Sequence, residues 1–595
     1  MAAAPRTYGL ARALQSPALS SRVCLRCLPA LRLSNARALS TTKARMTLAT
    51  FKIPKVSNEP NHHYAKGSAQ REGLLAAIEA QRKKGPIEIP LFVGGREVNA
   101  REAATQYNPS DHATAIAHYS LATPLNVDNA ILAALGAKRE WELTPFADRA
   151  AVFLKAADLI STKYRYELMA ITMLGQGKNA WQAEIDAAAE LCDFFRFNVQ
   201  YAEELYAQQP AHHSAGSWNR IEYRPLEGFV YAVSPFNFTA IGGNLAGVPA
   251  LLGNVVIWKP SDYAVAAAHL VHKILLEAGL PENVIQFVPG KPEEVTQAVL
   301  ANKQFGALHY TGSTDVFRQL YGKIGLGVSQ GRYRGYPRIV GETGGKNFHL
   351  VHPSADIQNA VVHTVRGAFE YTGQKCSATS RLYVAKSIWP EFKEKLVKET
   401  EALKVGVPWE LENFVGPVIH KASFEKLVGV MKNAENDGQL ELLTGGKWDD
   451  SKGYFIHPTI YQTTNAQHPL LSRELFGPIL TVYVYDDTTD ERAFEVVCYS
   501  IDRTSDYGLT GAVFASDRRA IRTAEDLLRN AAGNFYVNCK STGAVVGQQP
   551  FGGARASGTN DKAGSANIVS RFVSLRSIKE EFVPSTTVTY PSNEV

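Results

Sequence analysis

Hydrophobic residues at three- and four-residue spacing predict several long helices in the first third of the chain. Residues 127–141 and 147–174 follow this spacing, for example at Phe153 and Ala157, and each range predicts one amphipathic helix. Residues 183–207 contain few helix-breaking residues and predict a third long helix.

Short apolar runs alternate with helical patterns from residue 228 onwards. Runs at 230–233, 255–258, 285–288 and 308–310 predict strands, with helices expected from about 240, over 264–278, over 293–301 and from about 314. A second alternation begins at 348–351 and passes through helices near 357–371 and 389–403 and a strand at 479–485 to about residue 545. This order predicts an α/β fold built from βαβ units in parallel, doubly wound sheets.

Two segments depart from this alternation. Residues 208–232 contain the pair His212–His213 and short alternating runs, and they predict a protruding β-hairpin. Residues 566–590 alternate weakly and predict an added edge strand.

The range 228–258 carries no Asp, Glu, Lys, Arg or His, so a membrane span must be considered. Pro235, Pro249 and five glycines interrupt it, and it contains no unbroken apolar run of about 18 residues, which a span requires. A buried strand–turn–helix–strand explains the composition better, and no stable membrane insertion is expected.

The net charge of +6 is concentrated at the N-terminus. Residues 1–50 hold eight basic and no acidic residues, which leaves 55 basic against 57 acidic residues in 51–595. A body that binds nucleic acid through bulk positive charge is therefore not expected. Arg, Ala, Leu and Ser at amphipathic spacing predict a mitochondrial transit peptide over 1–42 and a mitochondrial matrix location. A disordered basic arm is the alternative, and Met46 could start an untargeted form.

The six cysteines form no even-spaced framework, which favours a reducing compartment. Cys24 and Cys27 make an isolated CxxC in the basic leader, and no metal site is expected. Cys376 follows a predicted helix within the sequence Gly-Gln-Lys-Cys-Ser-Ala. A lone cysteine is usually a small buried hydrophobe, but here the adjacent Lys375 and the helix-end N–H groups favour a thiolate nucleophile.

Two further side chains are candidates for the same chemistry. Glu342 lies among glycines in Gly-Glu-Thr-Gly-Gly-Lys-Asn and could act as a base in a cleft, or it could be an ordinary surface acid. Asn237 follows the predicted strand 230–233, at the sheet edge where ligands bind in open α/β folds. Its amide could stabilise an oxyanion or cap the next helix.

The nucleotide-binding signal differs from the usual glycine pattern. No G-x-G-x-x-G joins a strand to a helix, but Gly312 and Ser313 do so and could place a pyrophosphate at a helix N-terminus. Lys259, Ser261 and Asp262 follow another strand. The lysine could bind ribose or phosphate, and the aspartate could accept from a ribose 2′-OH while repelling a 2′-phosphate.

Taken together, these motifs resemble the aldehyde dehydrogenase superfamily. The resemblance covers essentially all of 51–595. It rests on an ordered set comprising Asn237, Lys259, Gly312–Ser313, Glu342, Cys376, Glu474-Leu-Phe-Gly-Pro478 and Pro550-Phe-Gly-Gly553. Phe236 and the loop 541–555 are similar to the branch that oxidises L-glutamate γ-semialdehyde. In that loop Ala544 stands where some members have Ser, so the contact expected there comes from the backbone.

The resemblance implies the domain organisation. It implies a Rossmann-type NAD-binding domain (51–207 and 233–341), an α/β catalytic domain (342–560) and a small β oligomerisation arm (208–232 and 561–595). It also implies at least a homodimer and channelling with proline dehydrogenase.

The same resemblance implies roles for the site residues and the cofactor NAD. Cys376 would be the nucleophile, Glu342 the base for hydrolysis and Asn237 an oxyanion donor. The cofactor set is Lys259, Ser261, Asp262, Gly312, Ser313, Glu474 and Phe476, and the substrate set is Ser234, Phe238, Ser377, Gly543, Ala544 and Phe551. A dehydrogenase of another semialdehyde and a non-catalytic relative are the alternatives.

Overall fold

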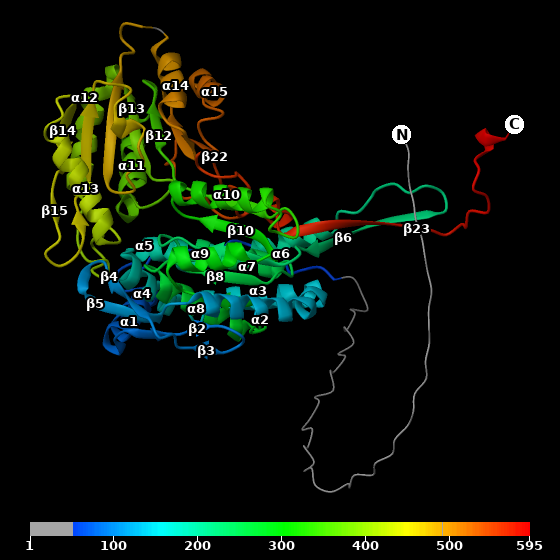
Figure 1. The fold of residues 1–595 in the computed structure, drawn as a ribbon. Coiled ribbons are helices and arrows are strands. Elements are labelled where there is room, and N and C mark those ends of the chain that lie inside the picture. The colour runs from blue at the N-terminus through cyan, green and yellow to red at the C-terminus, as the bar shows by residue number, and fades with distance from the viewer. Residues whose placement is uncertain (1–50, 491, 595) are drawn as a thin grey trace, which may run out of the picture. The chain divides into compact units, whose positions relative to one another are not determined.

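Two seven-stranded sheets form the frame of the protein in the computed structural model, which describes residues 51–490 and 492–594 (Figure 1). The leader 1–42, the CxxC at Cys24 and Cys27, and Met46 lie outside these residues. Among the described residues no helix is long and apolar enough to cross a bilayer, and no group of three metal-ligating side chains is placed to hold an ion.

The first sheet confirms the predicted alternation from residue 228. Its strand order is β11-β10-β7-β8-β9-β2-β3, and the five strands from β11 to β9 are parallel. The bounds are β2 Leu91–Phe92, β3 Glu97–Val98, β7 Phe229–Val233, β8 Val256–Lys259, β9 Ile285–Phe287, β10 Phe305–Thr311 and β11 Arg338–Glu342. Chain order reverses between β7 and β10. The carboxyl ends of these two neighbours therefore form a topological switch point, where open α/β sheets bind ligands.

Helices cover both faces of this sheet because alternate strand residues point to opposite sides. Tyr231 and Ile257 pack with α2 (Pro124–Leu143), α9 (Pro292–Ala301) and α10 (Thr314–Ser329). Ala232 and Trp258 pack with the helices of the other face. Those are α3 Phe146–Ser161, α4 Arg165–Gln176, α6 Leu191–Tyr206, α7 Thr239–Leu251 and α8 Val265–Ala278. The uncharged range 228–258 is thus β7, α7 and β8, buried in the sheet.

Two of the predicted helices are interrupted. The single helix expected over 147–174 is wrong, because the chain leaves helical geometry at Thr162 (φ −117°, ψ −83°) between α3 and α4. The helix expected over 183–207 begins as a π-helical turn, Glu184–Glu190, before continuing as α6. Apolar spacing continues across both irregularities, so the pattern alone did not reveal them.

The second sheet has the order β14-β17-β18-β13-β12-β20-β21 and is parallel except at the edge strand β14. Its strands are β12 Asn347–Val351, β13 Thr379–Ala385, β14 Leu440–Thr444, β17 Thr459–Thr463, β18 Ile479–Tyr485, β20 Thr510–Phe514 and β21 Asn534–Val537. The helices α11 Ile357–Phe369 and α12 Trp389–Glu401 lie on one face, and α14 Ala493–Thr504 and α15 Arg518–Leu527 lie on the other. The α13 helix (Lys421–Ala434) packs beside β17.

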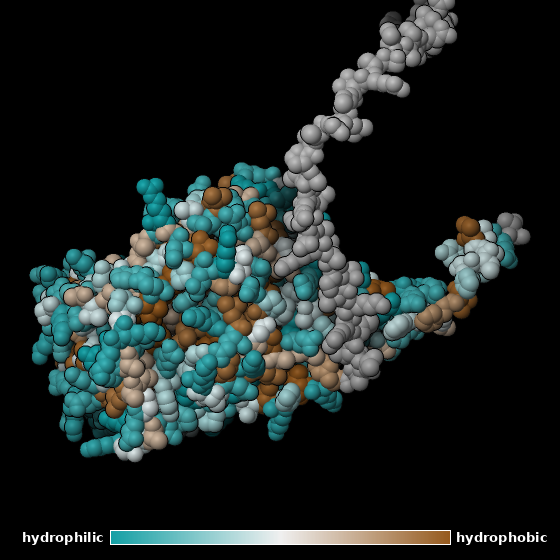
Figure 2. Space-filling view, turned by 90° about the horizontal axis from the view of Figure 1, so that it is seen from below, coloured by the Kyte–Doolittle hydropathy of each residue, from teal (hydrophilic) through white to brown (hydrophobic). Residues whose placement is uncertain are grey.

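Beyond these sheets, a two-stranded arm projects from the first sheet (Figure 1). It pairs β6 (Ser217–Pro225) with β23 (Val573–Glu581) in antiparallel register. The hairpin expected over 208–232 is therefore wrong, since the partner strand comes from the tail, and 229–232 belong to β7. Apolar side chains remain exposed on and next to the arm, including Trp218, Leu575 and Phe582 (Figure 2).

The remaining elements are short or peripheral. A three-stranded sheet contains β1 Ile87–Ile89, β4 Ala103–Asn108 and β5 Asp111–Ser120, and it is preceded by α1 Ala69–Lys84. Short strand pairs join β15 Trp448–Asp449 to β16 Phe455–Ile456 and β19 Tyr507–Gly508 to β22 Ala554–Arg555. The helices α5 Ala180–Ala183 and α16 Ala566–Ser570 complete the set.

Candidate active site

Cys376 lies in the turn that leads into β13, and its side chain lines a pocket of about 350 Å³. Tyr371, Thr372 and Gly373, just before it, all have left-handed φ values of 51°, 57° and 67°. This costly geometry is held by two hydrogen bonds, from Tyr371 Oη to Gln176 O (2.8 Å) and from Thr372 Oγ1 to Gly416 O (2.9 Å). The surrounding structure thus fixes the direction in which the thiol enters the pocket.

The electrostatics of the thiol differ from the expectation. Desolvation, with the carboxylates of Glu342 and Glu474 nearby, raises the pKa of Cys376 to about 12, although the backbone N–H groups of Ser377 and Cys376 act to lower it. Lys375 was expected to favour the thiolate, but its ammonium lies 3.0 Å from Glu370 Oε2 and is paired there. The adjacent cation therefore does not activate the thiol, and the helix-end N–H groups do so only in part.

Glu342 ends β11, and its carboxylate is set up to accept a proton. Burial raises the pKa of this carboxyl well above its usual value, while the N–H of Gly553 and the ammonium of Lys562 oppose that rise. Its Oε2 is buried and has no hydrogen-bond partner among the described residues. The Glu342 carboxylate is thus a free acceptor with a raised pKa, and its charge acts on the nearby Cys376 thiol. These are the properties of a general base.

Gly344 and Gly345, which follow Glu342, must be glycines because neighbouring atoms leave no room for a Cβ. A Cβ on Gly344 would lie 2.2 Å from Glu474 Oε2, and a Cβ on Gly345 would lie 2.4 Å from the Cys376 carbonyl oxygen. Glu474 Oε1 accepts a hydrogen bond from Gly345 N at 2.8 Å, and burial raises the pKa of Glu474 to about 7. The glycine pair therefore brings a second carboxylate to the same site.

Asn237 lies close to the nucleophile's turn. Its Nδ2 donates to Gln374 O at 3.1 Å, and the second N–H of that amide has no partner among the residues described. One N–H therefore fixes the amide beside the turn, and the other is left without a partner next to the nucleophile's turn. Phe236 stacks edge-to-face on Phe476 at 5.9 Å, which brings Phe476 to this side of the site.

The structure brings five of the six predicted substrate residues together. Phe238, Ser377, Gly543, Ala544 and Phe551 line the Cys376 pocket. Ser377 Oγ is hydrogen-bonded to Thr542 Oγ1 at 2.7 Å. Ser234 does not line this pocket, because it is buried beside the sheet and accepts a hydrogen bond from Trp258 Nε1 at 3.0 Å.

The predicted cofactor residues gather at the carboxyl ends of the parallel strands. Lys259 ends β8, and its Nζ lies 3.0 Å from Pro260 O and 3.6 Å from Asp262 Oδ1. Ser261 lies between them on the same turn. Asp262 Oδ1 is buried and has no hydrogen-bond partner within the described chain.

The second half of this cofactor set lies at the start of α10. Gly312 follows β10, and a Cβ there would lie 2.5 Å from Tyr310 Oη. Ser313 caps α10 by accepting from Val316 N at 3.3 Å. A helix N-terminus therefore opens at the switch point of the sheet, where it can bind an anionic group.

Sequence reasoning missed the charged groups beneath the pocket. Lys178 and Asp186 form a fully buried ion pair of 2.7 Å, and the ammonium lies 4.1 Å from the centre of the Phe238 ring. Asp186 also accepts from Thr239 N and Ala240 N, which anchors the start of α7. Lys178 follows Gly175-Gln-Gly177 at the end of α4, and helical periodicity carried no signal for its partner.

A second buried cluster lies beside the thiol. Lys375 and Lys540 both bind Glu370, at 3.0 and 2.7 Å. Although burial acts to raise it, these two ammonium groups hold the pKa of Glu370 down, at about 2, whereas burial lowers the pKa of Lys375 to about 8. Glu190 also lines the pocket, and burial raises its pKa to about 8. The pocket lining thus includes both ammonium and carboxyl groups.

Lys178→Met should destabilise the protein by about 3 kcal/mol, because it leaves Asp186 buried without its countercharge. The loss should lie at the low end of the usual range, since Asp186 keeps its two backbone N–H donors. The free energy of unfolding in urea measures the effect. Lys421→Met, which removes an exposed ion pair of 3.7 Å to Glu425, should change it by less than about 0.5 kcal/mol. Equal losses in the two variants would contradict the assignment.

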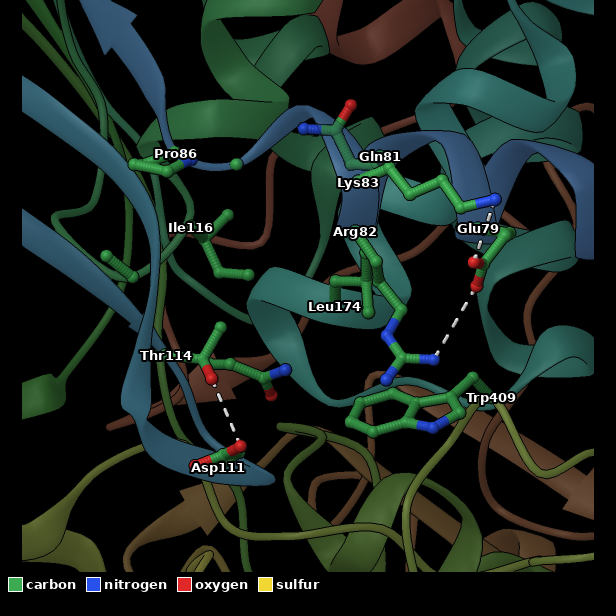
Figure 3. Close-up of a pocket in the computed structure, with 13 residues that line it drawn as sticks. Glu79, Gln81, Arg82, Lys83, Pro86, Asp111, Thr114, Ile116, Leu174 and Trp409 are labelled. Carbon is green, nitrogen blue, oxygen red and sulfur yellow. Dashed lines mark hydrogen bonds and ion pairs between the residues drawn. The ribbon is translucent and has the colours of Figure 1, made fainter.

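A larger pocket of about 570 Å³ lies elsewhere, beside α1 and β5 (Figure 3). Arg82 lies over the Trp409 ring at 5.1 Å, Glu79 faces Arg82 and Lys83, and Thr114 donates to Asp111 at 3.0 Å. Its polar groups therefore pair with one another, and no predicted site residue lines it. The smaller pocket at Cys376 is the candidate active site.

Comparison with known proteins agrees with this geometry. The chain is 66% identical over 559 residues to the mitochondrial delta-1-pyrroline-5-carboxylate dehydrogenase of Emericella nidulans, covering 94% of this chain and 97% of that protein. It is similar to the solved structure of the Mycobacterium tuberculosis delta-pyrroline-5-carboxylate dehydrogenase bound with NAD, with a TM-score of 0.88, 46% identity and coverage of 92% and 100% of the two chains.

A further solved structure, proline utilization A from Bdellovibrio bacteriovorus, has a TM-score of 0.84 at 28% identity and covers 91% of this chain and 55% of that one. The sequence pattern of the aldehyde dehydrogenase family matches residues 97–578, which include the thiol, the carboxylate and both sheets described above except the edge strand β2. The chain therefore belongs to the aldehyde dehydrogenase family.

Proposed function

We propose that the protein oxidises L-glutamate γ-semialdehyde, the open form of 1-pyrroline-5-carboxylate, to L-glutamate with NAD. The observation that carries this proposal is the pocket itself. The Cys376 thiol lies in it together with the backbone of Gly543 and Ala544 and with charged groups of both signs. An aldehyde whose far end is an α-amino acid matches this distribution, and the relatives' names support the same substrate.

The residues present fit NAD. Asp262 Oδ1 is a buried acceptor without a hydrogen-bond partner in the described chain, as a ribose hydroxyl requires, and it faces the Lys259 ammonium at 3.6 Å. Ser313 opens α10 at the switch point and would face the pyrophosphate. Glu474 and Phe476 would hold the nicotinamide end close to Cys376.

The first half of the mechanism forms a covalent adduct on the enzyme. The Cys376 thiol gives up its proton to solvent as Sγ bonds to the aldehyde carbon, and the resulting oxyanion accepts from the free Asn237 N–H and the Cys376 backbone N–H. Ser377 and the N–H groups of Gly543 and Ala544 hold the substrate carboxylate, and Phe238 and Phe551 pack on the aliphatic chain. NAD, when bound, supplies the hydride acceptor for the oxidation. A thioester on Cys376 remains.

The second half of the mechanism hydrolyses this thioester. Glu342 removes a proton from water through its unpartnered Oε2, and the water oxygen attacks the acyl carbon. L-glutamate leaves, and Cys376 regains its thiol. The raised pKa of Glu342 suits this role, because a base that titrates nearer to neutral pH accepts the proton more readily.

Substrate choice tests the proposal directly. The full chain should form NADH from 1-pyrroline-5-carboxylate with a kcat/KM at least about 10-fold above that for succinic or aminoadipic semialdehyde, because those lack the matching head group or length. The same assay with NADP should be slower, since Asp262 repels a 2′-phosphate. A higher kcat/KM on either competing semialdehyde would overturn the substrate assignment.

The cellular setting is proposed with this function. We propose that residues 1–42 direct the protein to the mitochondrial matrix, in line with the mitochondrial name of its Emericella nidulans relative. We also propose that the arm joins at least two copies through side chains such as Trp218 and Leu575, which are exposed in the single chain. Likeness to proline utilization A supports an association with proline dehydrogenase.

A further inference from the structure

The loop 543–549, which forms one wall of the Cys376 pocket, buries Val546 in the hydrophobic core but makes few hydrogen bonds to the rest of the protein. Gly543 and Gly547 have left-handed φ values of 95° and 82°. Three hydrogen bonds close the loop on itself, all between Val545 and the pair Gln548 and Gln549. A loop of this kind needs an external contact to keep its backbone donors aimed in one direction.

That external contact is Asn58, which lies 488 residues away from Val546 in the sequence. Asn58 Nδ2 donates to Val546 O at 2.7 Å, and Asn58 Oδ1 accepts from Gln548 Nε2 at 2.9 Å. Among the described residues, every hydrogen bond that leaves the loop 543–549 ends on Asn58. The Asn58 side chain therefore binds the loop through both a donor and an acceptor.

Asn58 is itself fixed to the helix behind the pocket. Its Nδ2 also donates to Asp193 Oδ2 at 2.7 Å, and the neighbouring Glu59 N donates to Asp193 Oδ1 at 2.7 Å. Asp193 lies on α6 and is 4% exposed. Arg165 and Arg196 hold the Glu59 carboxylate at 2.6 and 2.7 Å. Ile53 N donates to Glu203 Oε1 at 3.0 Å, so the segment 51–64, here called the strap, is anchored on both sides of Asn58.

The strap also reaches the pocket, since Asn58 and Glu59 line it together with Gly543, Ala544 and Cys376. From this arrangement we infer that Asn58 is a positioning residue that determines specificity. It holds the loop so that the N–H groups of Gly543 and Ala544 can receive the substrate's charged head. The inference rests on the proposed function, because it concerns the end of the substrate that a simple aldehyde lacks.

Comparing the activity of the variants on two substrates distinguishes this positioning role from a general structural role. L-glutamate γ-semialdehyde uses the loop, whereas butanal presents the same aldehyde chemistry with no carboxylate or ammonium. In the full chain, Asn58→Ala should lower kcat/KM for the semialdehyde by about 10- to 100-fold, mainly through KM, since it deletes two hydrogen bonds to the loop and one to a carboxylate. The value for butanal should stay within about twofold, because Cys376 and Glu342 are untouched.

Binding of the product gives a second readout. The Kd of L-glutamate, measured by calorimetry, should rise in Asn58→Ala by a similar factor. Lys55→Ala is the matched control, because Lys55 is an exposed strap residue with no hydrogen bond or ion pair in the part of the chain described. It should match the wild type on both aldehydes.

Gln548→Ala keeps the test informative if Asn58→Ala does not fold. This variant removes only the 2.9 Å bond at the exposed side of the loop and should lower kcat/KM for the semialdehyde alone, by about three- to tenfold. Equal losses on both aldehydes, or no loss on either, would overturn the positioning role while leaving the proposed function standing. Absence of semialdehyde oxidation by the wild type would overturn both.

Discussion

Cys376→Ala is expected to abolish NADH formation, with a loss of about 10⁴- to 10⁶-fold, because no other described group in the pocket can form the thioester. The variant removes one sulfur atom from a turn that is held by Tyr371 and Thr372, so the fold and NAD binding should persist. Steady-state NADH production measures the loss, and calorimetric titration with NAD measures the retained binding. The expected result is therefore an inactive protein that still binds its cofactor.

Cys539→Ala is the matched control, since Cys539 is an exposed free cysteine outside the pocket lining. It should keep wild-type turnover. Alkylation by iodoacetamide should inactivate both this control and the wild type. Turnover retained in Cys376→Ala would show that the nucleophile has been assigned wrongly.

Glu342→Gln is expected to slow steady-state turnover by about 10²- to 10⁴-fold, the usual contribution of a general base. Acylation depends on Cys376 and should continue, so a burst of NADH should precede the slow phase. Intact mass spectrometry should then detect a glutamyl group on the protein. The amide is isosteric with the carboxyl, so packing against Gly552 is preserved.

The pH dependence provides a further check on the same residue. Because burial raises the pKa of Glu342, its carboxylate is lost as the pH falls through that raised value, and the rate of hydrolysis should fall with it. Glu342→Gln should lose this pH dependence. Glu394→Gln, at an exposed position of α12, should keep both the rate and the pH profile. A Glu342→Gln variant without an acyl adduct would contradict the base assignment.

The parallel sheets could be predicted from the sequence because their strands are nearly continuous apolar runs. Runs such as 230–233 and 255–258 are stable in few arrangements apart from strands buried between helices. The proximity of the three candidate catalytic residues could be predicted too, since Asn237 and Glu342 both lie at strand ends that parallel topology brings to one edge. Local pattern was sufficient for these strands, but it missed the local break between α3 and α4 at Thr162.

Where contacts join distant segments, the sequence pattern failed. The strand β6 looked like half of a hairpin because nothing in residues 208–232 reveals that its partner is 573–581. Lys375 looked like an activating neighbour of Cys376 because Glu370 and Lys540 meet it only in the folded chain. Asn58 gave no signal at all, since its partner loop lies 488 residues away. Polar groups that pair across long stretches of sequence leave no periodic pattern from which the pairing could be predicted.

The arm has a consequence for the timing of assembly. Its strands come from segments about 350 residues apart, as in the contact between Arg224 and Ser574. A chain that is still being synthesised or translocated cannot form the arm, because β6 can pair only when the C-terminal strand β23 is present. The charged residues of β6, including Arg220 and Glu222, discourage wrong pairing of its free edge in that interval. If the arm joins copies of the chain as proposed, these copies can recognise one another only after synthesis has passed residue 581, so pairing would report that both strands of the arm are present.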